Sequence, residues 1–172
     1  MAYFEDLTDY SYYLYRPHTK NVGWLASTHD FPKLTPPEEM LDLLWEHCKI
    51  SVVQMRGLHH CEFCAPPSPS VYAIRQGQRL QLGSAEVRVL SRGGDIYAAP
   101  TLIYHYVKTH HYKPPDEFLR ALTEGIRPPS PEYFEALKML NLEWNKTSGG
   151  DSPGKGFRGS VEVRLPIYFD ES

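Results

Sequence analysis

The sequence predicts an α+β domain in which a small antiparallel sheet is covered by three to four helices. Three short runs with strand character lie at residues 71–75, 79–82 and 86–90, and glycine-containing turns separate them. This spacing is typical of a meander. Segments with a helical period, each opened by proline, stand before and after these runs. A length of 172 residues fits one such domain better than two.

The first predicted helix begins near Thr35. Threonine is a favourable N-cap, the two prolines that follow suit a first turn, and the two glutamates after them favour the positive helix end. The residues that share its apolar face are Met40, Leu41, Leu44, Trp45 and Cys48. We therefore expect Cys48 to be a core thiol rather than a metal ligand.

Further elements complete the predicted domain. Later helices are expected at residues 100–110, 114–122 and 131–142. Further strand character lies at residues 21–25 and 51–55. We assign residues 1–143 to a single α+β domain. Residues 144–172 are assigned to a flexible linker and a C-terminal edge strand at 161–165, both part of the same domain.

Composition and charge limit the classes of function. The chain has 18 Lys and Arg against 21 Asp and Glu, a formal net charge of −3, and no run of basic residues. General nucleic-acid binding needs a basic stripe, so we expect no nucleic-acid partner. No apolar run approaches a membrane span, and the acidic N-terminus lacks a signal-peptide pattern. A cytoplasmic protein without a membrane partner is therefore expected.

A C-x₂-C motif is the sharpest chemical feature. Cys61 and Cys64 are separated by two residues in a segment bounded by Gly57 and Pro66. Structural zinc sites with four tetrahedral Cys and His ligands often begin with such a knuckle. The motif therefore predicts one structural Zn²⁺ per chain. A reduced thiol pair and a redox pair are the alternatives, and the prolines that follow disfavour the helix start that a redox pair would need.

Two histidines are the expected partners of the cysteines. His105 and His110 have a spacing found in Cys₂His₂ sites, so a zinc ion would clamp the cysteine loop onto the later helix. Residues five apart on a regular helix point about 140° apart, so the helix must widen near Thr109 for both to reach one ion. His59 is the alternative ligand. His105 as a hydrogen-bonded core histidine is the competing interpretation.

The order of several motifs resembles a family of small uncharacterised bacterial proteins. The blocks are YFEDL from Tyr3, NVGWL from Asn21, HxCxxC from His59 and YAAPxLxxHYxxxHxYxPP from Tyr97, spread over roughly residues 1–140. The family is a domain of unknown function, so the resemblance implies a pattern and no activity. Five residues of this chain coincide with positions of the pattern that could bind a metal. They are His59, Cys61, Cys64, His105 and His110.

No catalytic motif accompanies the predicted zinc site. The sequence lacks H-E-x-x-H, the deaminase pattern, the nucleophile elbow and phosphate-binding glycine loops. We therefore expect a non-enzymatic, zinc-containing protein that binds a protein partner, and an immunity-type antagonist of a basic toxin is the first hypothesis. A zinc-dependent hydrolase is the alternative. A zinc-containing regulator that contacts nucleic acid is the second alternative.

The N-terminal segment is the expected partner surface. It carries Glu5, Asp6 and Asp9 between aromatic residues. The aromatic members are Tyr3, Phe4, Tyr10, Tyr12, Tyr13 and Tyr15. Aromatic anchors with carboxylates suit a basic partner. The alternative is that these aromatic side chains pack the segment onto the sheet, and their exposure distinguishes the two.

Overall fold

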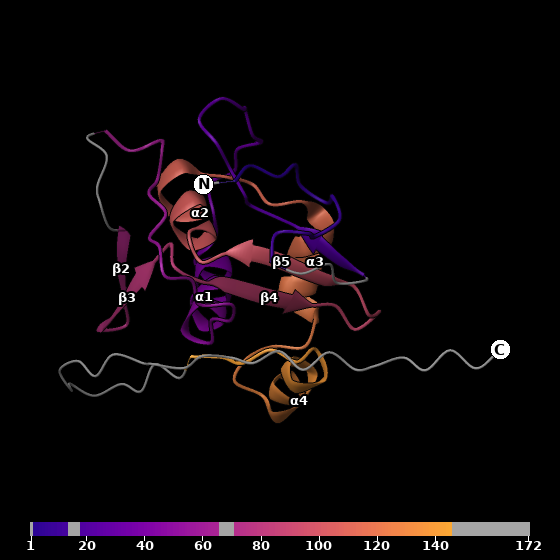
Figure 1. Cartoon of the computed structure of the whole chain (residues 1–172). Helices are drawn as coiled ribbons and strands as arrows, with labels where there is room; N and C mark the ends of the chain where they lie inside the picture. Colours follow the sequence, from indigo (N-terminus) through magenta and orange to yellow (C-terminus); the bar gives the residue numbers. More distant parts are fainter. Residues whose placement is uncertain (1, 14–17, 66–70, 146–172) are drawn as a thin grey trace.

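The described residues of the chain form a small sheet, a separate hairpin and four helices (Figure 1). The computed structural model describes residues 2–13, 18–65 and 71–145. The strands are β1 (Thr19–Asn21), β2 (Val71–Arg75), β3 (Gln78–Leu82), β4 (Glu86–Leu90) and β5 (Ile96–Pro100). The helices are α1 (Glu38–Lys49), α2 (Ile103–His110), α3 (Asp116–Glu124) and α4 (Pro131–Met139). The predicted α+β class is confirmed.

The main sheet is mixed rather than purely antiparallel. β5 lies at its centre and pairs in parallel with β1, with Thr19 opposite Ile96. On its other side β5 pairs antiparallel with β4, with Glu86 opposite Pro100. β2 and β3 form a separate two-stranded antiparallel sheet. The three runs at 71–90 therefore do not form one continuous meander.

The turn at Gly83 separates β4 from the hairpin. Gly83 has a φ of 93°, which L side chains rarely adopt, and its amide donates to the Thr101 hydroxyl at 2.9 Å. All five residues of β4 are buried, whereas β2 alternates between buried and exposed positions. A strand that is buried throughout needs cover on both faces. β4 therefore pairs with β5 inside the domain and is not part of the exposed hairpin of β2 and β3.

Two helices begin later than the sequence predicted. Thr35 is not an N-cap, because α1 begins at Glu38 after an extended Pro37 with φ −67° and ψ 149°. A residue that precedes proline avoids the helical region, which keeps the run before Glu38 extended. Pro100 ends β5, where its missing amide costs no ladder bond, and α2 begins at Ile103.

Two predicted strands also differ from the observed ones. The strand expected at 21–25 lies at Thr19–Asn21. Residues 51–55 do not form a strand, although Val52 makes isolated bridges to Glu86 and Trp144. Val53 has a φ of 50°, which interrupts the extended chain.

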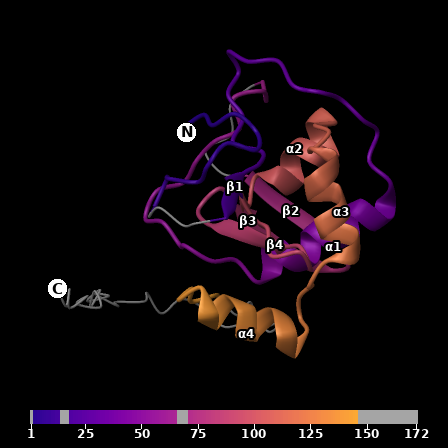
Figure 2. The same cartoon turned by 90° about the vertical axis from the view of Figure 1, so that its right-hand side faces the viewer.

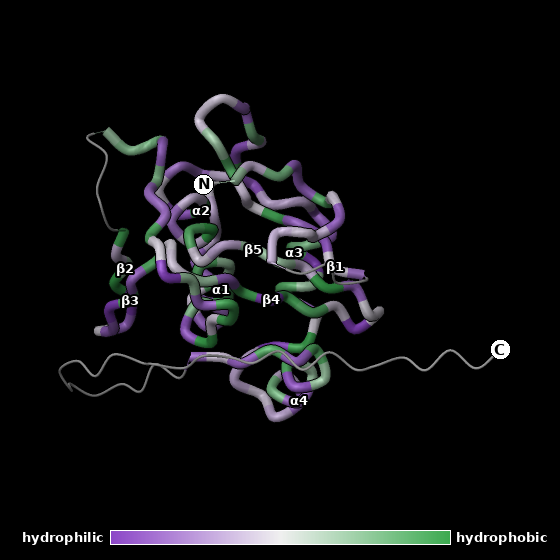
Figure 3. The backbone as a smooth tube through the Cα atoms, in the orientation of Figure 1, coloured by the Kyte–Doolittle hydropathy of each residue, from purple (hydrophilic) through white to green (hydrophobic). Residues whose placement is uncertain are grey.

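The main core lies between α1, its neighbouring helices and the sheet. α1 packs against α2, α3 and β4, and hydrophobic residues gather along α1 and β4 (Figure 3). The fully buried residues of this main core include Leu44, Trp45, Val87, Ile103 and Phe118. Cys48 is buried in this core and contacts the Thr101 carbonyl at 3.7 Å, as expected of a core thiol.

α4 has its own smaller cluster at the opposite end of the molecule from α2 (Figure 2). Tyr133 and Leu137 pack there on Val52 and Leu90, and the Tyr133 hydroxyl donates to the Arg88 carbonyl at 2.7 Å. No helix among the described residues is long and apolar enough to cross a membrane. The edge strand predicted at 161–165 lies outside the described residues.

The aromatic N-terminal segment divides into packed and exposed members. Phe4, Tyr10 and Tyr12 surround Trp24, and Tyr10 is 1% exposed. Tyr3 is 37% exposed and Tyr13 is 57% exposed. Tyr15 lies outside the described residues. Packing onto the domain therefore accounts for Phe4, Tyr10 and Tyr12, and the two exposed aromatic residues, Tyr3 and Tyr13, lie toward the two ends of the described segment.

Candidate metal centre

Cys61 and Cys64 stand in an irregular segment between α1 and β2. A close backbone approach holds the start of this segment, because the amide of His59 donates to the carbonyl of Gly83 at 2.9 Å. A Cβ atom on Gly83 would lie 2.4 Å from the His59 carbonyl oxygen. Only glycine fits this position. The hairpin turn thus fixes where the cysteine segment begins.

His105 and His110 come from α2, and the end of that helix widens as their joint approach requires. The amide of His111 donates to the Tyr106 carbonyl five residues back instead of four. The amide of Tyr112 donates to the same carbonyl at 3.1 Å. The widened turn brings the two imidazole centroids to 5.0 Å. The expectation of a loosened helix near Thr109 is therefore confirmed.

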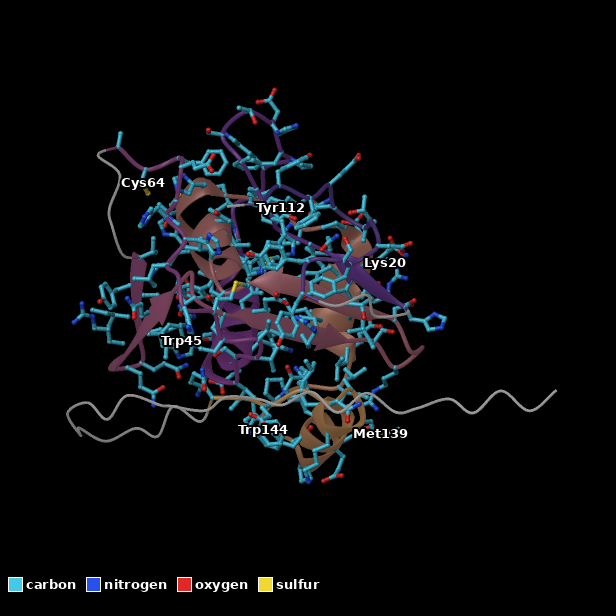
Figure 4. The ribbon with its side chains drawn as sticks, viewed as in Figure 1. Lys20, Trp45, Cys64, Tyr112, Met139 and Trp144 are labelled. Carbon is cyan, nitrogen blue, oxygen red and sulfur yellow. The ribbon has the colours of Figure 1, made fainter. Side chains whose placement is uncertain are left out.

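The four side chains meet beside α2, and Figure 4 shows Cys64 at this end of the molecule. The ligand atoms of Cys61, Cys64, His105 and His110 all lie within 4.8 Å of one another. His110 Nε2 is 3.2 Å from Cys61 Sγ and 3.5 Å from Cys64 Sγ. His105 Nε2 is 3.3 Å from Cys64 Sγ and 3.2 Å from His110 Nε2.

These distances fit a tetrahedral zinc ion. Zinc bonds of about 2.3 Å to sulfur and about 2.0–2.1 Å to nitrogen place tetrahedral ligands about 3.5 Å apart for S···N and about 3.3 Å apart for N···N. The observed S···N distances of 3.2, 3.3 and 3.5 Å and the N···N distance of 3.2 Å lie close to these values. The donor set of two thiols and two imidazoles is also the one zinc prefers.

Hydrogen bonding alone does not account for this arrangement. An imidazole Nε2 offers one N–H or one lone pair, directed along a single line in the ring plane. His110 Nε2 nevertheless lies within 3.5 Å of three other ligand atoms. A single N–H or lone pair on Nε2 cannot point at three neighbouring atoms at once. A cation between the four atoms would instead be bound by a lone pair from each of them. The geometry therefore favours a shared centre over a network of paired donors.

Burial keeps the imidazoles in the form that binds metal. Burial first and then the neighbouring His110 lower the pKa of His105 to about 4. The pKa of His110 is lowered by burial and by nearby cationic groups. Both rings are neutral at pH 7, with a lone pair on one nitrogen. The Thr109 hydroxyl lies 3.3 Å from His105 Nδ1. In the tautomer that binds metal through Nε2, Nδ1 carries the proton and donates it to this hydroxyl.

Two backbone amides in the cysteine loop offset part of the cost of a buried Cys61 thiolate. Burial raises the pKa of the Cys61 thiol to about 11, and hydrogen bonds from the backbone amides of Phe63 and Cys64 oppose this rise. Amide donors to sulfur stabilise a thiolate. A bound cation would supply the remaining stabilisation, and metal binding would release the thiol protons.

His59 is not among the four clustered residues, although its backbone anchors the segment. Sequence reasoning missed two supporting side chains, Thr109 and Glu62. Glu62 accepts hydrogen bonds from the amide of Ser27 at 2.9 Å and from its hydroxyl at 3.0 Å. No local pattern links residues 27 and 62, so this contact has no sequence signal.

The fold and the site together define a small α+β domain with a Cys₂His₂-type cluster suited to a metal ion. The chain belongs to a family described as a domain of unknown function, DUF7919, whose model matches residues 2–123. All four clustered residues fall inside that match, and α4 falls outside it. No curated protein and no solved structure matches the chain.

Proposed function

We propose that this protein is a non-enzymatic, zinc-containing binding domain. One Zn²⁺ per chain is held by Cys61, Cys64, His105 and His110. The observation that carries the proposal is the convergence of four zinc-type donors from a loop and a helix on one centre. Four protein ligands complete a tetrahedral shell, which is the mark of a structural site.

The zinc ion acts as a clamp in this proposal. The cysteine segment has no helix or strand of its own from residue 56 to residue 65. The ion joins it to α2, and the segment in turn supports a neighbouring loop. Glu62 holds Ser27 through two hydrogen bonds, and Phe63 packs edge-on against Phe31 at 5.3 Å. The metal thus orders a surface that local structure alone would leave loose.

The bound partner in this proposal is a basic protein. The formal net charge of −3 and the exposed carboxylates favour encounter with a positive surface. An immunity-type antagonist of a toxin, acting in the cytoplasm, is a function of this kind. A zinc-dependent hydrolase needs three protein ligands and a water instead of four protein ligands.

Metal analysis of variants tests the proposal. Protein purified without chelator is expected to contain about one zinc per chain, and Cys61→Ser is expected to lose zinc and thermal stability while its circular dichroism keeps the helices and strands. Cys48→Ala, a buried cysteine outside the cluster, is the matched control and keeps its zinc. Protein without zinc would overturn the proposal. Catalytic turnover that disappears in Cys61→Ser without loss of stability would favour the hydrolase.

A further inference from the structure

A second site lies on the surface that the cysteine segment supports. A cavity of about 240 Å³ opens between residues 3–6 and residues 25–32. We infer that this cavity binds the guanidinium group of an arginine presented by a basic protein partner. The inference rests on the proposed binding function and names its surface and the chemistry of its partner.

The size of the cavity suits one side chain. Pockets that hold drug-sized ligands and cofactors run from about 300 to 1,000 Å³, and this cavity is smaller. Its walls combine Tyr3, Phe4 and Phe31 with the carboxylates of Glu5, Asp6 and Asp30. A side chain with an apolar stem and a charged planar head group fits this cavity, because the stem can pack on the aromatic residues and the head group can contact the carboxylates.

The charge of the cavity favours a cation. Three carboxylates line it, and none of its lining residues in the described part of the chain is Lys or Arg. Asp6 accepts from the Gly23 amide at 2.9 Å and from the Tyr112 hydroxyl at 2.7 Å, which fixes its position and leaves lone pairs free. Within the described chain, the side chains of Glu5 and Asp30 have no ion-pair partner. Lys33 packs over the ring of Phe31, with its Nζ 5.8 Å from the ring centroid.

A flat aromatic surface stands at the rim. The rings of Tyr3 and His29 are stacked with centroids 3.7 Å apart and an interplanar angle of 8°. Tyr3 is 37% exposed and His29 is also exposed, so the stack lies at the surface. A guanidinium group stacks on aromatic faces and presents five donors in its plane. An ammonium group stacks less well and does not present its donors in one plane.

The three carboxylates do not form a converging group of metal ligands. Within the described part of the chain, the cysteine–histidine cluster is the one group of three or more His, Cys, Asp or Glu side chains whose ligand atoms converge. Separated carboxylates suit a planar cation whose donors diverge, because each donor reaches a different oxygen. An arginine side chain has this shape.

The experiment is an NMR titration of the full, zinc-loaded chain with the blocked peptide acetyl-Gly-Arg-Gly-amide. The lysine and citrulline forms of the same peptide serve as ligand controls. We expect saturable shifts of amides in residues 3–6 and 25–32, strongest with arginine and absent with citrulline. Glu5→Gln with Asp30→Asn is expected to weaken binding about tenfold. Glu117→Gln with Glu124→Gln, two exposed carboxylates on α3, is the matched control and leaves binding unchanged.

Any one of four results would overturn the inference. They are no shifts at the cavity, equal shifts with citrulline, shifts spread over all acidic surfaces, and stronger binding of the lysine peptide than of the arginine peptide. Zinc is measured on the same samples. Arginine binding by a chain without zinc would reject the zinc proposal and keep this site, whereas a zinc-loaded chain that ignores arginine would reject this site alone.

Discussion

At the scale of single residues, the proposed metal centre has a hydroxyl contact that the sequence motif does not include. Thr109 lies one turn after His105 and contacts its Nδ1 at 3.3 Å. Hydrogen bonds to the second nitrogen of a metal-binding histidine fix the ring and its tautomer. We expect Thr109→Val to lower zinc affinity about tenfold, measured by competition with a chromophoric chelator. Thr123→Val, a threonine bonded only to its own helix, is the control, and equal losses in both variants would contradict the role of Thr109.

Gly83 is the second residue on which the centre depends. Its φ of 93° and the 2.4 Å approach to the His59 carbonyl act together. Gly77 shares a positive φ, 74°, but has no atom within 4 Å of the added Cβ. Gly77→Ala should therefore cost about 1–2 kcal/mol of unfolding free energy from strain alone. Gly83→Ala should cost clearly more in urea unfolding and should weaken zinc binding. Equal costs would show that the contact with His59 is unimportant.

Single residues also show what the sequence can predict. The spacing of Cys61 and Cys64 identified the cysteine half of the site, because a tight turn between two thiols is a local property. The choice of His110 over His59 depended on the widened end of α2, which follows from tertiary packing. The contact of Glu62 with Ser27 joins residues 35 apart in the chain, and local patterns carry no information about it.

At the scale of elements, β4 carries a buried ion pair that hydrophobic patterning does not reveal. Glu86 and Arg88 point to the same side of the strand, and their side chains are 0% and 3% exposed. Arg88 Nη1 lies 2.6 Å from the Glu86 carboxylate, which also accepts from the Tyr10 hydroxyl at 2.9 Å. Alternation of charged and apolar residues predicts a half-exposed strand. The ion pair instead allows both faces of β4 to be buried. The sequence pattern therefore did not reveal that β4 pairs with β5 in the interior of the domain.

Breaking this pair is expected to destabilise the domain strongly. Arg88→Met would leave the Glu86 charge buried without its partner, which costs about 3–5 kcal/mol of unfolding free energy. The double variant Glu86→Leu/Arg88→Met removes both charges and should recover most of that loss. Chemical unfolding of the parent, of Arg88→Met and of the double variant measures how much of the lost unfolding free energy the second substitution restores. A double variant as unstable as Arg88→Met would contradict the account.

At the scale of the whole molecule, the site and α4 lie at opposite ends (Figure 1). α4 packs on its own cluster with Tyr133 and Leu137, away from the cysteine segment. A zinc clamp should therefore stabilise one end of the domain without being needed by the other.

Chelation of the metal tests this division. Hydrogen–deuterium exchange after treatment with chelator should rise in residues 56–65, in residues 26–32 and at the end of α2. Exchange in α4 should stay close to that of untreated protein, because its contacts do not pass through the cluster. An equal rise throughout the molecule would mean that the metal supports the whole core. No change at residues 26–32 would mean that Glu62 and Phe63 do not transmit the clamp.

X-ray absorption at the zinc edge tests the central claim most directly. The account predicts a four-coordinate ion with two sulfur ligands at about 2.3 Å and two nitrogen ligands at about 2.0–2.1 Å. Cys64→Ser should replace one sulfur by a lighter atom, and His59→Ala should leave the spectrum unchanged. A shell with one sulfur or with a coordinated water in the parent protein, or a spectrum altered by His59→Ala, would contradict the Cys61, Cys64, His105 and His110 ligand set.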